Sequence, residues 1–135
     1  RRGGQVCVRG LLREMSGNRG AMNGATQVPY RQDIVPEELQ LIYQRLHFSP
    51  AVRVGNILHI SGQVGRDADL KVVPVGDPPT EEGMERQFEQ CFENVRRILT
   101  AAGADFSDVF QLETWFTNMP TQLKTFMVRT QRMLA

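Results

Sequence analysis

The side chains best suited to chemistry gather at the end of one predicted strand. Ser61, Gly62 and Gln63 follow an alternating apolar run, which places a hydroxyl and an amide on one face, with a glycine between them that admits close approach of a ligand or another backbone. Such a cluster is either a satisfied hydrogen-bond network or the floor of a small-molecule pocket, and the sequence leaves both open. We expect Ser61 to bridge backbone groups or contact a ligand rather than act as a nucleophile. His59, on the same face, either bonds within the sheet or contacts that ligand.

A tight hairpin must position this cluster. Two short alternating runs flank Gly55-Asn56, a dipeptide typical of two-residue hairpin turns. In the second run, Leu58, Ile60 and Val64 are predicted to share one face. The opposite face would carry Ile57, His59, Ser61 and Gln63.

A long helix is predicted to follow, from Thr80 to Gly103. Thr80 is a good N-cap, Glu81 and Glu82 suit the first turn, and Gly103 is a typical helix end. Apolar residues at three- and four-residue steps form one stripe: Met84, Phe88, Cys91, Phe92, Val95, Ile98, Leu99 and Ala102. The other side, with Glu85, Glu89, Glu93, Arg96 and Arg97, is predicted to be a solvated face.

Residues 109–117 alternate as a strand does, with Phe110 and Phe116 on one face and Trp115 on the other. Trp115 suits subunit packing or the core, with a pocket wall as the alternative. A second helix is predicted to begin at Asn118–Pro120. Its predicted apolar side is Leu123, Phe126, Met127, Thr130, Met133 and Leu134.

The chain is predicted to divide into a leader and one domain. Residues 1–30 are rich in Gly, Arg, Asn and Ser and are expected to be a disordered or non-native leader, with an organelle transit peptide as an alternative. Residues 31–135 form a single domain, in which 36–46 suits either a short helix or an edge strand. The chain stops inside a helical pattern, so we expect this domain to be C-terminally incomplete.

Charge and composition exclude several classes. The net charge is +1, but residues 1–21 hold five arginines and one acid, which leaves the other 114 residues with a net charge of −3. This predicts no nucleic-acid partner. No apolar run approaches the roughly 20 residues of a membrane span. Cys7 and Cys91 are not expected to form a disulfide, which favours the cytoplasm. No metal-ligand spacing exists, and no cofactor is expected.

Several segments in a fixed order carry a family resemblance: the hairpin ending Ser-Gly-Gln at 61–63, Gln-Phe at 87–88, Phe-Glu-Asn-Val at 92–95, Leu-Thr-Ala-Ala-Gly at 99–103, Asp-Val at 108–109 and Thr-Trp-Phe-Thr-Asn-Met at 114–119. Together they resemble the Rid family of enamine/imine deaminases, also called YjgF or L-PSP proteins. The resemblance covers roughly residues 46 to 134.

The resemblance implies an α+β, chorismate-mutase-like fold: a mixed, mainly antiparallel sheet with two helices packed on one face. It also implies a homotrimer with clefts between subunits. The implied function is hydrolysis of reactive enamines and imines from amino-acid metabolism to keto acids and ammonia, similar to that of 2-iminobutanoate/2-iminopropanoate deaminases. The alternative is a non-catalytic paralogue that binds a small metabolite, such as a carboxylate, or a protein partner in the same cleft. An RNA-cleaving protein is a third interpretation, disfavoured by the charge.

Transferred residue by residue, the resemblance gives a partial site. Ser61, Gly62 and Gln63 match the signature, whereas Phe48 stands where the family has tyrosine, and Phe126 stands where an ungapped count places an asparagine. These five are the predicted substrate-binding residues. The family's arginine and acid would lie beyond residue 135, so no catalytic residue is assigned. Without a cation for the carboxylate or a group to position water at the cleft, the chain as it stands is expected not to accelerate imine hydrolysis.

Overall fold

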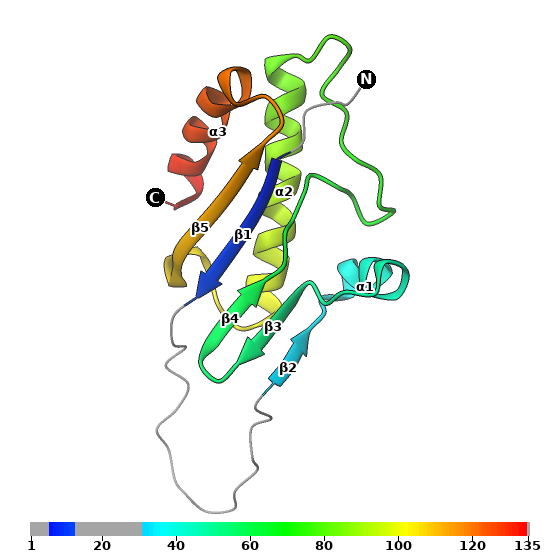
Figure 1. Ribbon diagram of the computed structural model, residues 1–135, viewed down its shortest axis with the longest axis vertical. Coiled ribbons are helices and arrows are strands. Elements are labelled where there is room, and N and C mark those ends of the chain that lie inside the picture. The colour runs from blue at the N-terminus through cyan, green and yellow to red at the C-terminus, as the bar shows by residue number, and fades with distance from the viewer. Residues whose placement is uncertain (1–5, 13–30, 135) are drawn as a thin grey trace, which may run out of the picture.

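The computed structural model describes residues 6–12 and 31–134 as an antiparallel sheet covered by helices on one face (Figure 1). The five strands are β1 (Val6–Leu12), β2 (Arg31–Ile34), β3 (Ala51–Val54), β4 (Ile57–Ile60) and β5 (Val109–Phe116). They lie in the order β2-β3-β4-β1-β5, and each neighbouring pair is antiparallel. The predicted α+β class is confirmed.

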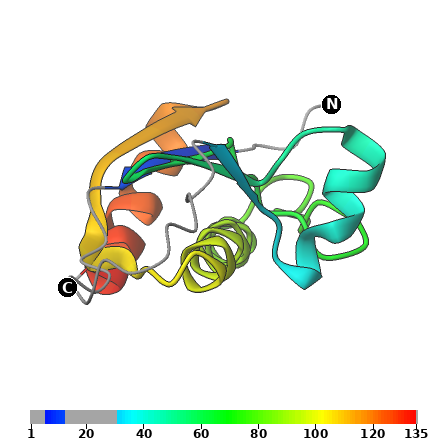
Figure 2. The ribbon, with the colours of Figure 1, turned by 90° about the horizontal axis from the view of Figure 1, so that it is seen from below.

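Two long helices, α2 (Glu81–Ala101) and α3 (Met119–Leu134), lie against the same face of this sheet, and no helix of the described residues covers the opposite face (Figure 2). The short helix α1 (Gln40–Leu46) follows a 3-10 turn at Glu37–Leu39 and ends at His47, which has a φ of 55°. Residues 37–46 are therefore helical, and the edge strand comes just before them, as β2.

The predicted hairpin is confirmed as β3 and β4. Gly55 occupies the turn with a φ of 60°, a conformation that a side chain would disfavour. Leu58 and Ile60 are buried under the helices, 3% and 1% exposed, whereas Ile57 lies on the open face and is 37% exposed. The strand alternation therefore sets which side of the chain faces the core as it reaches Ser61.

Helix α2 follows its prediction closely. The Thr80 side chain accepts a hydrogen bond from the Gly83 amide at 3.0 Å and so caps the helix. Every residue of the predicted apolar stripe is less than 9% exposed: Met84, Phe88, Cys91, Phe92, Val95, Ile98, Leu99 and Ala102. This stripe forms most of the core between the sheet and the helices.

The predicted disordered leader is corrected at residues 6–12, which form β1 in the middle of the sheet. Leu11 pairs with His59 of β4, and on the other side the register runs from Val6 opposite Phe116 to Leu12 opposite Val109. The prediction rested on the overall Gly- and Arg-rich composition of residues 1–30. Within them, the seven-residue segment VCVRGLL has a local composition that suits a strand. Residues 1–5 and 13–30 lie outside the described part of the chain.

The predicted apolar side of α3 is wrong in part. Phe126 is buried, at 5% exposed, but Leu123 and Met127 are 39% and 51% exposed, whereas Gln122 and Thr125 are buried. The side chains of Met133 and Leu134 lie outside the described residues.

Ion pairs between α2 and α3 help to explain why α3 buries Gln122 rather than Leu123 and Met127. Arg129 binds Glu85 of α2 at 3.0 Å and Glu89 at 2.7 Å, which brings the face that carries Gln122 and Arg129 against α2. Buried Gln122 is also satisfied locally, because its Oε1 accepts from the Asn118 amide at 3.0 Å. The charged side of α2 is therefore not only a solvated face: part of it holds α3.

Candidate functional site

A small pocket collects three of the five predicted binding residues. Phe48, Gly62 and Gln63 line a cavity of about 160 Å³ between α1, the chain that follows β4, and α2. The remaining lining residues are Ile42, Leu46, Val64, Arg66 and Asn94. The polar end of β4 therefore borders a concave, partly apolar cavity, and Ser61 and Gln63 are also hydrogen-bonded within the chain, so the structure contains both of the arrangements that the sequence left open.

Ser61 supports this pocket from outside its lining. Its Oγ donates to the Ser49 carbonyl at 2.7 Å, and its amide donates to the Pro50 carbonyl at 2.9 Å. The hydroxyl thus joins the end of β4 to the segment that carries Phe48. The predicted backbone-bridging role is confirmed.

The pocket floor is fastened to α2 by buried groups. Gln63 is 3% exposed, and its side-chain Nε2 donates to the Ser61 carbonyl at 3.0 Å. The backbone carbonyl of Gln63 accepts from the Cys91 Sγ at 3.3 Å. Asn94, 1% exposed, donates from Nδ2 to the carbonyls of Val64 at 3.1 Å and Arg66 at 2.9 Å. These contacts fix the backbone of residues 63–66, which we call the pocket loop.

Gly65 allows the pocket loop to lie this close to α2. A Cβ at this position would stand 2.3 Å from the Gln87 carbonyl oxygen, well inside van der Waals contact. The Gln87 side chain also donates to the Val73 carbonyl at 2.8 Å, so it holds the far side of the same connection. A glycine is therefore required here for packing.

Arg66 is the site residue that sequence reasoning missed. It lines the pocket, its Nε is shielded from solvent, and among the described residues this nitrogen has no hydrogen-bond partner. The neighbouring Asp67 does not pair with it, because the Asp67 Oδ1 accepts from the Asp69 and Lys71 amides at 3.0 and 2.9 Å. The expectation that no cation lies at the cleft is therefore corrected.

Phe126 does not line this pocket. Its ring lies in the core, with centroids 5.7 Å from Phe88, 5.7 Å from Phe92 and 5.2 Å from Phe116. An ungapped count along the sequence placed it at a pocket position, but the orientation of α3 directs it under the sheet. The structure therefore brings Phe48, Gly62 and Gln63 together and leaves Phe126 apart.

His59 and Trp115 are not among the residues that line this pocket. His59 pairs with Val52 of β3 within the sheet. Trp115 is 51% exposed, which excludes the core of this chain as its place and leaves subunit packing, with a pocket wall as the alternative, as the prediction.

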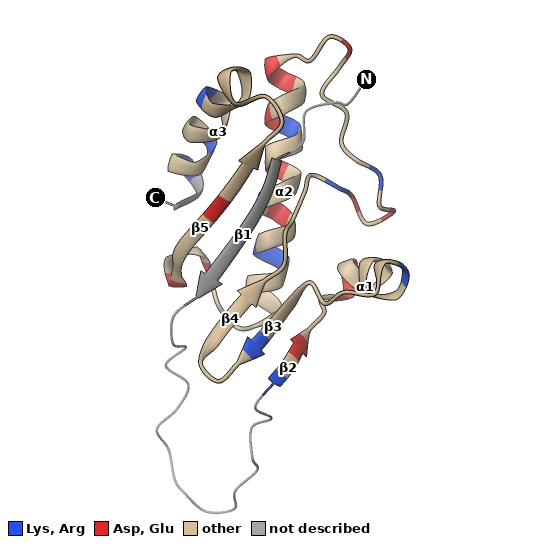
Figure 3. Ribbon diagram, in the orientation of Figure 1, with Lys and Arg blue, Asp and Glu red and all other residues tan. Residues whose placement is uncertain are grey.

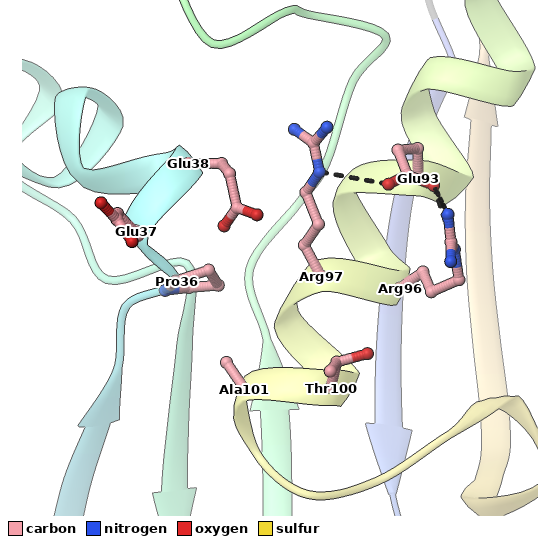
Figure 4. A pocket seen from close by; sticks show the side chains of 8 residues that line it. All are labelled: Pro36, Glu37, Glu38, Glu93, Arg96, Arg97, Thr100 and Ala101. Atoms are coloured by element: carbon pink, nitrogen blue, oxygen red, sulfur yellow. Dashed lines mark hydrogen bonds and ion pairs between the residues drawn. The ribbon is translucent and has the colours of Figure 1, made fainter.

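A larger cavity of about 390 Å³ lies between the 3-10 turn and the C-terminal half of α2, where Glu38 and Arg97 stand on opposite walls (Figure 4). Glu93 accepts from the Arg97 Nε at 3.2 Å and also pairs with Arg96. Much of the charge in this cavity is therefore already balanced. A third cavity, of about 470 Å³, lies near Asn118 and Gln122, away from the signature residues.

Charge and metal ligands point to no other site in the described part of the chain. Acidic and basic residues are interspersed along α2 (Figure 3). In residues 6–12 and 31–134, no group of three His, Cys, Asp or Glu side chains could hold a metal ion. No helix described here is long and apolar enough to cross a membrane.

The chain is similar in sequence to known proteins. Residues 39–132 match the family described as Endoribonuclease L-PSP. The chain is 30% identical over 97 residues to the RutC family protein YjgH of Escherichia coli, an alignment that covers 72% of this chain and 68% of that protein. It is 32% identical over 74 residues to a 2-iminobutanoate/2-iminopropanoate deaminase of Dermatophagoides farinae, covering 53% of this chain and 51% of that protein. The chain thus spans only part of these relatives.

A solved structure titled Protein YJGH superposes with a TM-score of 0.60 at 25% identity, covering 76% of this chain and 73% of the other. The residues that match the family, 39–132, include the hairpin and α2, the two elements that hold the pocket. Sequence and structure agree, and the chain belongs to the Rid family, the YjgF or L-PSP proteins.

Proposed function

We propose that this chain forms the substrate pocket of a Rid-type deaminase that hydrolyses small enamines and imines from amino-acid metabolism. The observation that carries the proposal is the convergence of Phe48, Gly62 and Gln63 on one pocket. At about 160 Å³, the cavity is smaller than the roughly 300–1,000 Å³ typical of drug-sized ligands, which favours a metabolite of a few heavy atoms.

In the proposed reaction, water adds to the carbon of the C=N bond, that bond breaks, and ammonia leaves a keto acid behind. The apolar wall of Ile42, Leu46 and Phe48 would take the aliphatic part of the substrate and reduce its contact with bulk water. Gly62 also lines the pocket and is exposed, so the substrate could approach its backbone. Metal and cofactor are not required by this chemistry.

A second candidate is a non-catalytic binding protein of the same family. Two observations favour it: Phe48 has no hydroxyl, and the eight described residues that line the pocket include no acid to orient the water. Under the deaminase proposal, that acid comes from another subunit or from a part of the protein outside the described residues. An RNA substrate is disfavoured by the mixed charges of Figure 3.

Ammonia release from an imino acid generated in situ by an amino-acid oxidase tests the two candidates. The sequence alone predicted no acceleration, because neither a cation for the carboxylate nor a group to position water was found at the cleft. Arg66 provides a cation in the pocket lining, but none of the lining residues is an acid. Under the deaminase proposal, in which another subunit supplies that acid, we expect release above the rate without protein. Phe48→Tyr should raise the rate further, whereas Phe48→Ala should lower it. A rate equal to that of buffer for the wild type and for Phe48→Tyr would favour the binding protein.

We also propose that the protein is a homotrimer in which the open sheet faces pack together. The proposal is supported by family membership and by the bare face in Figure 2, where Ile57 and Trp115 are 37% and 51% exposed. Sedimentation at micromolar concentration tests it. A monomer that remains a monomer across the concentration range would refute both the trimer and a cleft shared between subunits.

A further inference from the structure

We infer that the cavity beside the first turn of α3 is a second ligand site, and that it binds a small neutral carboxamide with an aliphatic end. This cavity has a volume of about 470 Å³, within the roughly 300–1,000 Å³ of small-molecule sites. It shares no lining residue with the pocket that Phe48 lines, so the inference does not rest on the deaminase proposal.

The cavity lies where three segments meet at one end of the molecule. The first turns of α2 and α3 lie at this same end (Figure 1). Val75 and Pro79 come from the connection that precedes α2, and Met84 comes from the first turn of α2. The polar lining residues come from the end of β5 and the start of α3, so the cavity has an apolar and a polar part.

The first argument is an unpartnered donor on a buried glutamine. Gln122 is 2% exposed and lines the cavity. Its Oε1 accepts from the Asn118 amide at 3.0 Å, which orients the side chain, but its Nε2 forms no hydrogen bond with any described residue. A polar group withdrawn from water without a partner is unfavourable. The carbonyl oxygen of a ligand in this cavity would provide the missing acceptor.

The other buried amide side chains of the described residues show why Gln122 differs. Each of them donates to a backbone carbonyl: Gln63 at 3.0 Å, Gln87 at 2.8 Å and Asn94 at 3.1 and 2.9 Å. Their nitrogens are therefore satisfied within the fold. Gln122 alone among the four combines a nitrogen without a partner and a place in a cavity lining.

The second argument is the electrostatics of the lining. All seven lining residues are uncharged, so a charged ligand would lose water here without gaining a counter-charge. The N–H groups of the first turn of α3 carry a partial positive charge, which favours a carbonyl oxygen at this end. Asn118 lines the same end, and its side chain forms no hydrogen bond with a described residue. Its Oδ1 can accept from the NH2 of a carboxamide while the Gln122 Nε2 donates to the carbonyl.

The third argument is a preformed apolar wall. Val75 and Met84 are 4% and 8% exposed. The Val75 carbonyl accepts from the Thr80 amide at 2.8 Å, and a Cβ on Gly83 would stand only 2.3 Å from the same oxygen. The connection thus packs directly on α2, and this wall needs little reordering when a ligand binds. A short branched aliphatic group matches it.

The test is an NMR titration of the isotope-labelled 135-residue chain with three probes of matched shape. Isobutyramide is the neutral carboxamide, isobutyrate is the anion and isobutylamine is the cation. Gln122→Glu keeps an acceptor for the Asn118 amide and removes the Nε2 donor. Asn118→Ala removes the second amide and breaks no side-chain hydrogen bond within the described residues. The matched control, Gln131→Glu, makes the same chemical change at an exposed position of α3.

We expect isobutyramide to bind in the roughly millimolar range, because a ligand of so few atoms gains little binding energy. It should shift the Gln122 side-chain signals and the backbone amides of Asn118 and Thr121, but not the amide of Gly62. Isobutyrate and isobutylamine should bind at least about fivefold more weakly. Gln122→Glu should weaken isobutyramide binding roughly 10-fold or more, and Asn118→Ala about 3- to 10-fold, each through one lost hydrogen bond. Gln131→Glu should stay within about twofold of the wild type.

The inference is overturned by isobutyrate or isobutylamine binding as tightly as isobutyramide, or by shifts confined to the pocket that Phe48 lines. It is also overturned if Gln122→Glu binds isobutyramide within about threefold of the wild type. The absence of any shift well above millimolar concentration would show that the cavity holds only water. Thermal melting checks the fold of each variant. If Gln122→Glu does not fold, Asn118→Ala decides, and an affinity equal to that of the wild type refutes the site.

Discussion

Asn94 is predicted to hold the pocket loop in place, and replacing it tests the whole site. Its Nδ2 donates to the carbonyls of Val64 and Arg66, and its Oδ1 accepts from Gln90 Nε2 at 3.0 Å. Leucine has nearly the same size and shape but no hydrogen-bonding atom. Asn94→Leu therefore removes both contacts to the loop while the helix position remains filled.

The expected loss of stability follows from the two carbonyls that are left without this donor. An unsatisfied buried acceptor costs about 1–3 kcal/mol, and both bonds here are only partly buried, so the lower half of that range applies. Two acceptors give about 2–4 kcal/mol, from which the buried leucine recovers a part. We expect a net loss of about 2–3 kcal/mol in the free energy of unfolding.

Urea denaturation followed by circular dichroism measures this loss, and Gln90→Leu is the control. That variant removes the contact to Asn94 Oδ1 but leaves both loop bonds, so it should cost no more than about 1 kcal/mol. Limited trypsin digestion gives a local readout, since Asn94→Leu should speed cleavage after Arg66 and Lys71 in the loosened loop. A loss within about 0.5 kcal/mol of the control, with unchanged cleavage, would refute the role given to Asn94.

Three further substitutions test other parts of the structure. Phe126→Ala should destabilise the fold by about 3–5 kcal/mol in urea denaturation, because the ring is buried among three others; a cost below about 1 kcal/mol would place it outside the core. Gly65→Ala should cost roughly 1–3 kcal/mol in urea denaturation, because the new Cβ meets the Gln87 carbonyl; an unchanged free energy of unfolding would contradict the role of this close approach. Two hydrogen bonds hold the pKa of Asp105 below its ordinary value: the one from the Ser107 hydroxyl, which has the larger effect, and the one from the Ser107 amide. Asp105 therefore stabilises the folded state at pH values above its unfolded pKa, and this stabilisation is lost as the pH falls through the lowered pKa. Ser107→Ala should raise this pKa toward the ordinary value in an NMR titration, and no change would assign the shift to the amide alone.

The hairpin and α2 could be predicted from the sequence because each carries its own local determinants. Gly55-Asn56 fixes the turn, and Thr80 and Gly103 fix the ends of the helix, with an apolar repeat between them. These signals act within a few residues, and no distant segment opposes them. The place of Gly62 and Gln63 beside α2 follows from the same two elements.

Strand β1 and Arg66 could not be predicted in the same way, because both depend on distant partners. Residues 6–12 acquire their place only by pairing with β4 and β5, which lie about 50 and 100 residues away in sequence. Arg66 looked like one charge in a solvated loop. Its character as a pocket cation depends on Asn94 of α2 and on Leu46 of α1, which close around it in the fold.

The dependence of the pocket loop on α2 has a consequence for how substitutions act at a distance. The loop touches this helix through Cys91 Sγ, the Asn94 amide and the Gln87 carbonyl beside Gly65, so its position follows that of the helix. The opposite side of the same two turns carries Phe88 and Phe92, which pack on Phe126 of α3. A cavity made at Phe126 would thus relax the helix segment from which Arg66 takes its position. Ligand affinity and core packing should therefore be coupled in this chain, even though Phe126 never meets the ligand.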